Sequence, residues 1–351
     1  MKRRFSKQIK IGKVKIGGNA PVTVQSMTST PTKDVDATVG QINRLSDAGC
    51  EIIRVAVPDT EAALALKKIV AQISIPIIAD IHFDHRLALL AMENGVNGLR
   101  LNPGNIGGKK KIKEIVSAAR YQDIPIRIGV NAGSLEKTIL KKFGHPTPEA
   151  MVESAMDHVR ILEDLNFDLI KISLKSSNVN QMISAYRILS KKVDYPLHLG
   201  VTEAGTLISG TVKNSIGIGV LLSEGIGDTI RVSLTHDSVE EVKVAYEILK
   251  ALGLRQRGIE IISCPTCGRC QIDLFKLAEE VENSLSNISA PLKVAIMGCV
   301  VNGPGEAREA DIGVAGGQGQ GTLFKKGKVI KKVAESDLAD SLIKEVRKMD
   351  N

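Results

Sequence analysis

Residues 124–130 read IPIRIGV, a short β-rich run that carries one arginine between aliphatic side chains. Side chains alternate between the two faces of a β-strand, so an arginine and the isoleucines on either side of it point in opposite directions. In a closed barrel one of these faces meets the surrounding helices and the other meets the interior. The run therefore predicts a strand with an apolar outer face and a positive charge inside.

Similar runs recur along the chain and alternate with segments of helical periodicity, such as 36–50 and 148–165. The eight predicted strands are 22–27, 51–57, 75–81, 97–102, 124–130, 168–174, 196–201 and 229–234. Eight β/α repeats over about 250 residues favour a (β/α)8 TIM barrel over an open doubly wound sheet. A β-hairpin is predicted at 8–16, before the first repeat.

Six predicted strands place a basic residue between aliphatic ones: Arg54, Arg100, Arg127, Lys171, His198 and Arg231. Cations that converge on one lumen are tolerable only near its open mouth and with anions as partners. Internal acids such as Asp80 and Glu203 are the alternative partners, but two acids do not balance six bases. The pattern favours a polyanionic ligand, with a diphosphate as the natural candidate because guanidinium groups match phosphate oxygens in pairs.

Polar residues at or just past the strand ends would complete such a site. Taken singly, each is equally typical of a turn or a helix cap. They are Gln25, Asp80, His82, Asn102, Asn131, Ser173, Lys175, Thr202, Glu203 and Ser233.

The amino-acid composition limits the classes of partner and the cellular compartment that fit this chain. The net charge of +8 is dispersed, and aromatic residues make up only 3% of the chain, so a nucleic-acid partner is disfavoured. No apolar run approaches the ~18 residues of a membrane span, and the N-terminus lacks the apolar segment of a secretion signal. Five cysteines, an odd number, do not suggest a disulfide framework. We expect a cytoplasmic protein with free thiols.

A second α/β pattern follows the last predicted barrel helix, 238–253, and a short connection, 254–258. Strands are predicted at 292–299 and 311–317, a hairpin around 324–329, and helices over 270–285 and from about 336. The predicted domains are therefore 1–254 and 255–351.

The second domain opens with SCPTCGRC at 263–270. Cys264 and Cys267 have a C-x-x-C spacing at a strand end, and Cys299 ends another strand, so adjacent strands would bring the three thiols together. A structural zinc ion is coordinated by four protein ligands, and Cys270 could be the fourth. An iron–sulfur cluster can instead be bound by three thiolates, which leaves one iron for a weaker ligand. Cys50, alone at a helix end, is predicted to be a small buried apolar residue.

Two glycine-rich stretches are less informative. SIGIGV at 215–220 lies inside a helical pattern and predicts close helix packing. GVAGGQGQG at 313–321 is compatible either with backbone N–H groups around an anionic cluster or with a flexible loop.

Six motifs occur in order along the chain: VQSMT, DIHFD, RIGVNAGSLE, LGVTEAG, CPTCGR and GCVVNGPGE. With them the chain resembles the 4-hydroxy-3-methylbut-2-en-1-yl diphosphate synthase family in its bacterial two-domain form. The resemblance implies one [4Fe–4S] cluster per chain, bound by Cys264, Cys267, Cys299 and Glu306, with Cys270 not a ligand. It also implies that the smaller domain is of the sulfite and nitrite reductase type.

The implied reaction reduces 2-C-methyl-D-erythritol 2,4-cyclodiphosphate with electrons from ferredoxin or flavodoxin, a step of isoprenoid precursor synthesis in the methylerythritol phosphate pathway. Glu203 is the candidate proton donor, with Asp80 and His82 as the runner-up, and Glu306 is the ligand that substrate oxygen displaces. The hypothesis assigns these residues to the substrate: Arg54, Arg100, Arg127, Asn131, Lys171, Lys175, His198, Thr202, Arg231 and Ser233.

The connection at 254–258 predicts how the chain assembles. The last barrel helix ends opposite the mouth, and five residues span at most about 18 Å, less than a helix of some 24 Å. The cluster domain should therefore close on a neighbour's barrel in a head-to-tail homodimer. Two alternative functions both predict a colourless protein. One is a non-redox barrel enzyme that binds a phosphorylated or pterin-like ligand and carries structural zinc in its second domain. The other is a binding module whose zinc domain recruits nucleic acid.

Overall fold

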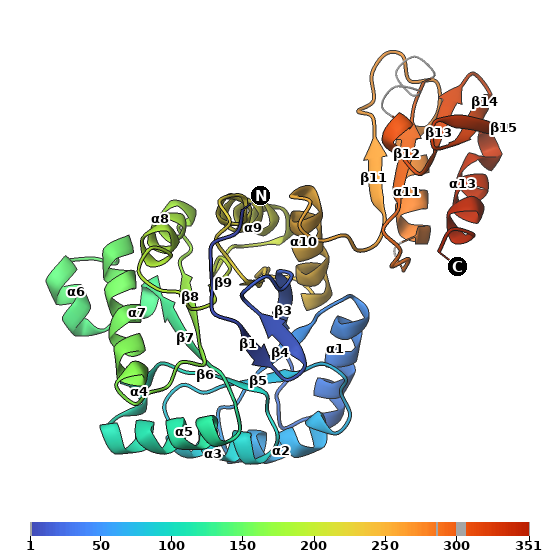
Figure 1. Cartoon of the computed structure of the whole chain (residues 1–351). Coiled ribbons are helices and arrows are strands. Elements are labelled where there is room, and N and C mark those ends of the chain that lie inside the picture. The colour runs from blue at the N-terminus through green and yellow to red at the C-terminus, as the bar shows by residue number, and fades with distance from the viewer. Residues whose placement is uncertain (1, 286, 300–306, 351) are drawn as a thin grey trace. The chain divides into compact units, whose positions relative to one another are not determined.

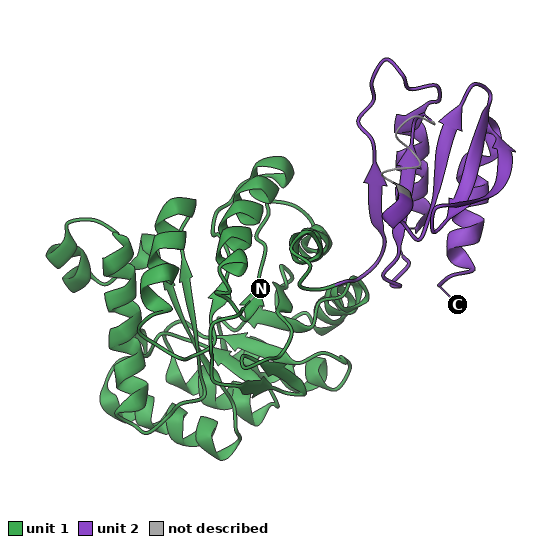
Figure 2. Ribbon diagram, turned by 45° about the horizontal axis from the view of Figure 1, so that its top comes forward, with its two compact units in different colours: residues 1–255 green, residues 256–351 purple. Residues whose placement is uncertain are grey.

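The computed structural model describes residues 2–285, 287–299 and 307–350. The chain forms two compact units, Met1–Arg255 and Gln256–Asn351 (Figure 2). Among the described residues, no helix combines the length and the apolar character that crossing a bilayer requires.

The first unit is a barrel of parallel strands, in the order β8-β7-β6-β5-β4-β3-β10-β9 (Figure 1). A bridge between Ile172 and Leu197 joins the two ends of this sheet and closes the ring. The (β/α)8 barrel prediction is confirmed. The strands are β3 (Thr23–Met27), β4 (Ile52–Ala56), β5 (Ile77–Asp80), β6 (Gly98–Arg100), β7 (Ile126–Asn131), β8 (Ile170–Lys175), β9 (His198–Leu199) and β10 (Thr229–Ile230).

Helices surround the strands and bury their apolar faces against them (Figure 1). Several begin at a residue whose side chain accepts a hydrogen bond from the first turn, for example Asp34 and Thr147. The helices are α1 (Val35–Asp47), α2 (Thr60–Val70), α3 (His85–Glu93), α4 (Pro103–Ile106), α5 (Lys109–Tyr121), α6 (Lys137–Phe143), α7 (Pro148–Glu163), α8 (Val179–Leu189), α9 (Leu207–Ser223) and α10 (Ser238–Ala251).

The predicted N-terminal hairpin is confirmed as β1 (Ile9–Ile11) and β2 (Val14–Ile16). Its isoleucines pack in one apolar cluster with Ile52 at the start of β4 and Ile78 in β5. Because these contacts lie toward the N-terminal ends of the strands, the hairpin covers the end of the barrel opposite the mouth. The polar residues of the lumen therefore lie toward the other end.

The second unit is a five-stranded sheet in chain order: β11 (Glu260–Ser263), β12 (Lys293–Met297), β13 (Ile312–Gly317), β14 (Gln320–Lys325) and β15 (Lys328–Ala334). The first three strands are parallel, and the last two join by antiparallel pairing. Helices α11 (Leu274–Leu285) and α13 (Leu338–Arg347) pack in one apolar cluster with the sheet. The likeness to sulfite and nitrite reductases stays a prediction.

Two details of this unit differ from expectation. The helix predicted from residue 270 begins at Leu274. The Cys270 N–H donates to the Cys267 carbonyl at 2.9 Å in a turn over 267–270, and Asp273 accepts the Lys276 N–H at 3.1 Å at the start of the helix. The stretch 313–321 belongs mostly to a β-hairpin, in which Gly317 pairs with Gln320. It is therefore ordered strand structure and no flexible loop.

The junction between the units is short. Arg255 donates to the Val22 carbonyl at 2.9 Å and pairs with Glu51 at 3.2 Å, which fixes it to the barrel. The Gly258 N–H donates to the Ser289 carbonyl at 3.1 Å within the second unit. Only residues 256–257 lie between these two anchored positions.

Candidate active site and cluster ligands

Strand register builds one row of charged residues across four neighbouring strands. Asp80 is paired with Arg100, Arg100 with Arg127, and Arg127 with Lys171. Residues in register on neighbouring parallel strands point to the same side of the sheet. All four side chains belong to residues no more than 8% exposed, so the row faces the lumen.

Asp80 is the acid of this row. Its Oδ1 lies 3.2 Å from Nη1 of Arg100, and its Oδ2 lies 3.4 Å from Nε of Arg54. Burial by itself would raise the pKa of Asp80, but Arg54 and Arg100 outweigh burial and hold the pKa below its usual value. Asp80 is thus an ionised bridge between two arginines.

Glu241 is a second buried acid, which sequence reasoning missed. Its Oε2 lies 3.6 Å from Nη2 of Arg231, and Oε1 accepts the Leu234 N–H at 3.0 Å. An acid in the first turn of α10 looks ordinary, because acids are favoured at helix N-termini. The sequence could have revealed Glu241 by its spacing: it lies four residues before Ala245, and so on the same buried face of the helix.

The remaining cations of the lumen have no ion-pair partner among the residues that the structure describes. Within the described residues, Nε and Nη1 of Arg127, Nζ of Lys171 and Nε2 of His198 have no hydrogen-bond partner. Burial, followed by repulsion from neighbouring cations, lowers the pKa of each of these groups, and of Lys175, well below its ordinary value. A bound anion would remove both penalties.

Glu203 does not balance these cations. It is exposed, four residues beyond the end of β9 at Leu199, and its backbone lies in the left-handed region with φ of +52°. The alternative in which Glu203 neutralises the internal bases is therefore wrong. A non-glycine residue held in this region costs about 1–3 kcal/mol and is often found at functional sites.

Three other predicted polar residues differ in their surroundings. Asn102 exchanges two hydrogen bonds of 2.9 Å with the backbone of Gly129, which accounts for it structurally. Gln25 is 1% exposed, and neither of its side-chain polar atoms has a partner within the described residues. His82 lies at the mouth, 3.6 Å from Asp80.

A further set lies at or beyond the strand ends. Asn131 is the last residue of β7, and Thr202 and Ser233 follow β9 and β10. Each is half-buried.

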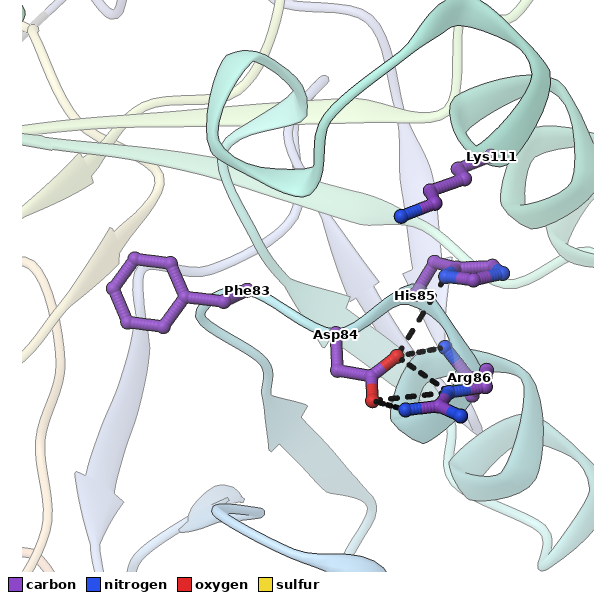
Figure 3. Close-up of a pocket in the computed structure, with 5 residues that line it drawn as sticks. All are labelled: Phe83, Asp84, His85, Arg86 and Lys111. Carbon is purple, nitrogen blue, oxygen red and sulfur yellow. Dashed lines mark hydrogen bonds and ion pairs between the residues drawn. The ribbon is translucent and has the colours of Figure 1, made fainter.

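A shallow pocket lies beside the mouth, between the loop after β5 and the first turn of α5 (Figure 3). Asp84 caps α3 by accepting the Arg86 N–H at 2.9 Å, and its Oδ2 lies 2.7 Å from Nη2 of Arg86. These bonds lower the pKa of Asp84 to about 2. Because Asp84 and Arg86 satisfy each other, this pocket does not share the unpaired charge of the lumen.

Glu136 and His158 form a clamp that the sequence did not reveal. Nδ1 of His158 accepts the Gly104 N–H at 3.1 Å, so Nε2 carries the proton that it donates to Glu136 at 2.8 Å. Ser154 donates to the other carboxylate oxygen at 2.8 Å. The clamp ties the loops after β6 and β7, which border the mouth, to α7. The only sequence signal was a glutamate in RIGVNAGSLE, shortly after a strand.

In the second unit, parallel pairing brings two predicted ligands to one sheet edge. Ser263 of β11 pairs with Ile296 of β12, so Cys264 follows one strand end and Cys299 follows its neighbour. The Gly298 N–H donates to Sγ of Cys264 at 3.3 Å. Hydrogen bonds to sulfur of this kind are typical of iron–sulfur ligands, so the donor set fits a cluster.

The other cysteines differ in their surroundings. Cys267 is exposed, and Cys270 donates to the Ile272 carbonyl at 3.3 Å. The fourth predicted ligand, Glu306, lies outside the described residues, and within them no three His, Cys, Asp or Glu side chains are grouped as metal ligands. Cys50 is 2% exposed, and burial raises its pKa to about 12, which confirms it as a buried apolar residue.

Family models account for both units. The GcpE TIM-barrel domain matches residues 6–246, and the GcpE protein C-terminal domain matches 260–348. The chain belongs to the GcpE family. The GcpE match over both domains confirms the resemblance suggested by the motifs.

Relatives support this assignment. Two proteins named 4-hydroxy-3-methylbut-2-en-1-yl diphosphate synthase (flavodoxin) are 62% identical to this GcpE chain over 344 residues. One is from Geobacter sulfurreducens, and the match covers 98% of both chains. The other, from Clostridium perfringens, is matched over 98% of this chain and 99% of its own.

Solved structures resemble the GcpE barrel only in fold. The 7,8-dihydropteroate synthase from Vibrio fischeri superposes with a TM-score of 0.51 at 12% identity, covering 71% of this chain and 99% of that one. Dihydropteroate synthase from Xanthomonas albilineans gives 0.50 at 14% identity, over 71% and 98%.

Proposed function

We propose that this chain reduces 2-C-methyl-D-erythritol 2,4-cyclodiphosphate to 4-hydroxy-3-methylbut-2-enyl diphosphate, the product in its relatives' names, in the methylerythritol phosphate pathway. The observation that carries the proposal is the set of buried cations without acids in the lumen. A ligand with two phosphate groups supplies the missing negative charge. Identity of 62% to two named synthases supports the choice of substrate.

The groups that gain most from the diphosphate are those for which the described part of the chain supplies no ion-pair partner: Arg127, Lys171, Lys175 and His198. Arg54, Arg100 and Arg231 already share Asp80 and Glu241 and are held in place by them. The same cations stabilise the phosphate oxygen that leaves when the ring opens. Asn131, Thr202 and Ser233 orient the ligand at the strand ends.

The reaction balances as follows: two electrons and one proton enter, the ring C–O bond to phosphate breaks, and a hydroxyl leaves with the proton as water. One [4Fe–4S] cluster, held by Cys264, Cys267, Cys299 and Glu306, would supply the electrons singly, with flavodoxin or ferredoxin as the source. The freed phosphate oxygen remains as an anion among the lumen cations.

Glu203 is the proposed proton donor, because it is an exposed acid held in a strained backbone conformation at the mouth. Glu203→Gln should lower kcat by about 10²–10⁴-fold with little change in KM. An unchanged kcat would move the role to Asp80 with His82.

The homodimer is part of the proposal. Residues 1–254 bind substrate and 255–351 bind the cluster, in a head-to-tail pair of cytoplasmic chains that share their sites. The anchoring of Arg255 and Gly258 supports it, because the chain between them is shorter than the sequence suggested.

Metal analysis tests the proposed function most directly. Protein purified without oxygen should contain about four iron and four sulfide per chain. Glu306→Ala should keep the three thiolates yet lower activity and cluster content, while Glu309→Ala, an exposed acid close by, should not. Zinc without acid-labile sulfide would overturn the redox assignment.

A further inference from the structure

Helix α7 joins the two loops that follow β6 and β7. Helices α4 and α6, which lie in these loops, both pack against α7 (Figure 1). The joining group is the clamp of Glu136 and His158. The His158 ring accepts the Gly104 N–H of α4 on one side and donates to Glu136, just before α6, on the other. His158 is buried, so this connection runs beneath the surface.

Helix capping does not account for Glu136. It is the N-cap residue of α6, a position at which side-chain oxygens commonly accept an N–H of the first turn. Its side chain makes no such bond. It turns to α7 instead, where its two oxygens accept hydrogen bonds of 2.8 Å from His158 and from Ser154. The whole side chain is therefore used to attach the loop after β7 to this helix.

The loop after β6 approaches the His158 ring very closely. A Cβ atom on Gly104 would lie 2.6 Å from Cε1 of His158, closer than real Cβ atoms come to another atom. A glycine at this position is thus required for the Gly104 N–H to reach Nδ1 at 3.1 Å. Backbone, imidazole and carboxylate form one tightly packed contact.

The loop after β6 also holds β7 at a second point. Asn102 exchanges two hydrogen bonds of 2.9 Å with the backbone of Gly129, and it stands only two residues before Gly104. The segment from Gly129 to Glu136 is therefore attached at both of its ends to the same short loop, at one end through Asn102 and at the other through His158.

Asn131 lies inside this doubly attached segment. It ends β7, and only residues 132–135 separate it from Glu136. Residues Ala132–Ser134 form a single 3-10 turn, and Leu135 is buried in the apolar core. A short segment held at both ends leaves the side chain of Asn131 few orientations at the mouth.

We propose that Glu136 and His158 are positioning residues, which hold Asn131 in the orientation in which it binds the diphosphate. The inference rests on the proposed function and adds to it two residues that act through a third. Such residues matter because a displacement of about 1 Å in a site can cost on the order of 10²-fold in rate.

A double-mutant cycle with inorganic pyrophosphate as the probe tests the positioning. Calorimetry gives the Kd of pyrophosphate for the parent, Glu136→Ala, Asn131→Ala and the double variant. Glu136→Ala alone should raise Kd roughly 5-fold, the contribution of one hydrogen bond. In the Asn131→Ala background the same change should raise Kd by less than about twofold, because the side chain that Glu136 positions is gone.

Tyr195→Phe is the matched control, because the Tyr195 hydroxyl donates to Glu163 at 2.8 Å at the opposite end of α7. This variant loses a hydrogen bond to a carboxylate of the same helix and should keep the parent Kd. Glu136→Gln keeps the length of the side chain and one acceptor oxygen, so its Kd should lie between those of the parent and Glu136→Ala. It takes the place of Glu136→Ala in the cycle if that variant does not fold.

An equal rise in Kd with and without the Asn131 side chain would overturn the positioning role. A parent Kd in Glu136→Ala or in Asn131→Ala would overturn it as well. Turnover of the cyclodiphosphate is measured separately. A parent that binds pyrophosphate but does not turn over the cyclodiphosphate would remove the proposed function and leave the comparison of Kd values intact, whereas a parent that does not bind pyrophosphate would overturn both.

Discussion

The lumen of the barrel holds more positive charge than its own acids balance, and Arg127 shows this most clearly. Arg127 is 2% exposed and lies in register between Arg100 and Lys171. Burial lowers the pKa of its guanidinium group. Burying this charge thus has an electrostatic cost that an anionic ligand would relieve.

Arg127→Ala should raise KM and lower kcat. Loss of a charge-assisted hydrogen bond costs about 1.5–3 kcal/mol, so kcat/KM should fall roughly 10–150-fold. Steady-state kinetics measures the change, and the iron content should equal that of the parent. Arg160→Ala, on the exposed side of α7, is the control. Unchanged kinetics would remove Arg127 from the site.

Glu136 should make stability depend on pH. Its hydrogen bond from His158 lowers its pKa from the ordinary 4.5 to about 2, so the unfolded chain takes up the proton first as the pH falls. The stabilisation is therefore present above about pH 4.5 and is lost as the pH falls toward 2. Glu136→Gln should flatten this part of the curve, measured by urea unfolding at a series of pH values.

Glu153→Gln is the matched control for this experiment, because Glu153 accepts its hydrogen bond from the exposed Lys142 at 2.7 Å. If Glu136→Gln and the parent lose stability equally between pH 4.5 and 2, the clamp does not hold Glu136 as described.

The residues differ in how far the sequence could predict them. Arg54, Arg100 and Arg127 could be placed inside because each is a lone cation between aliphatic residues of a strand. Glu241 could not, because an acid at a helix start is common. Glu136 and His158 could not either, because a bond between a loop and a helix 22 residues apart leaves no local pattern.

Among the elements, α9 is constrained on its inner face by glycine. A Cβ on Gly217 would lie 2.7 Å from Met182 and 2.9 Å from Val201, closer than real side chains approach. The SIGIGV stretch is thus confirmed as close helix packing.

Two glycine substitutions in helices should have opposite effects on stability. Gly217→Ala should lower the free energy of unfolding by about 1–3 kcal/mol, because the added methyl group overpacks the core. Gly40→Ala in α1, where the new methyl group meets nothing within 4 Å, should raise it by about 0.5–1 kcal/mol. Urea unfolding compares the two variants, and a stabilised Gly217→Ala protein would contradict the packing.

Hydrophobic periodicity carried most of the element prediction. The barrel strands were found because aliphatic residues flank each inward cation. The β13 and β14 hairpin was not found as a whole, since a run as rich in glycine as GVAGGQGQG has few side chains to show the alternation.

For the whole molecule, subunit mixing tests whether sites are shared. Alone, Cys267→Ser should be nearly inactive, and Arg127→Ala should keep only the reduced activity expected above. After subunit exchange, about half of the dimers are mixed and each holds one intact site, so activity should recover to about a quarter of the parent value. No recovery after verified exchange would refute the head-to-tail arrangement.

The sequence predicted two domains and a connection at 254–258, but not how tightly that connection is held. The bonds of Arg255 to Val22 and of Gly258 to Ser289 join residues far apart in the chain, so no local pattern announces them.

Because of these two bonds, the connection between the units is short and fixed at both ends. The stretch from Arg255 to Gly258 contains three peptide steps and reaches about 11 Å at most. The backbone angles of Gln256 and Arg257 are therefore the main rotational freedom of the connection. A stiffer residue at either position would restrict the backbone rotations of the connection and leave every side chain in the lumen untouched.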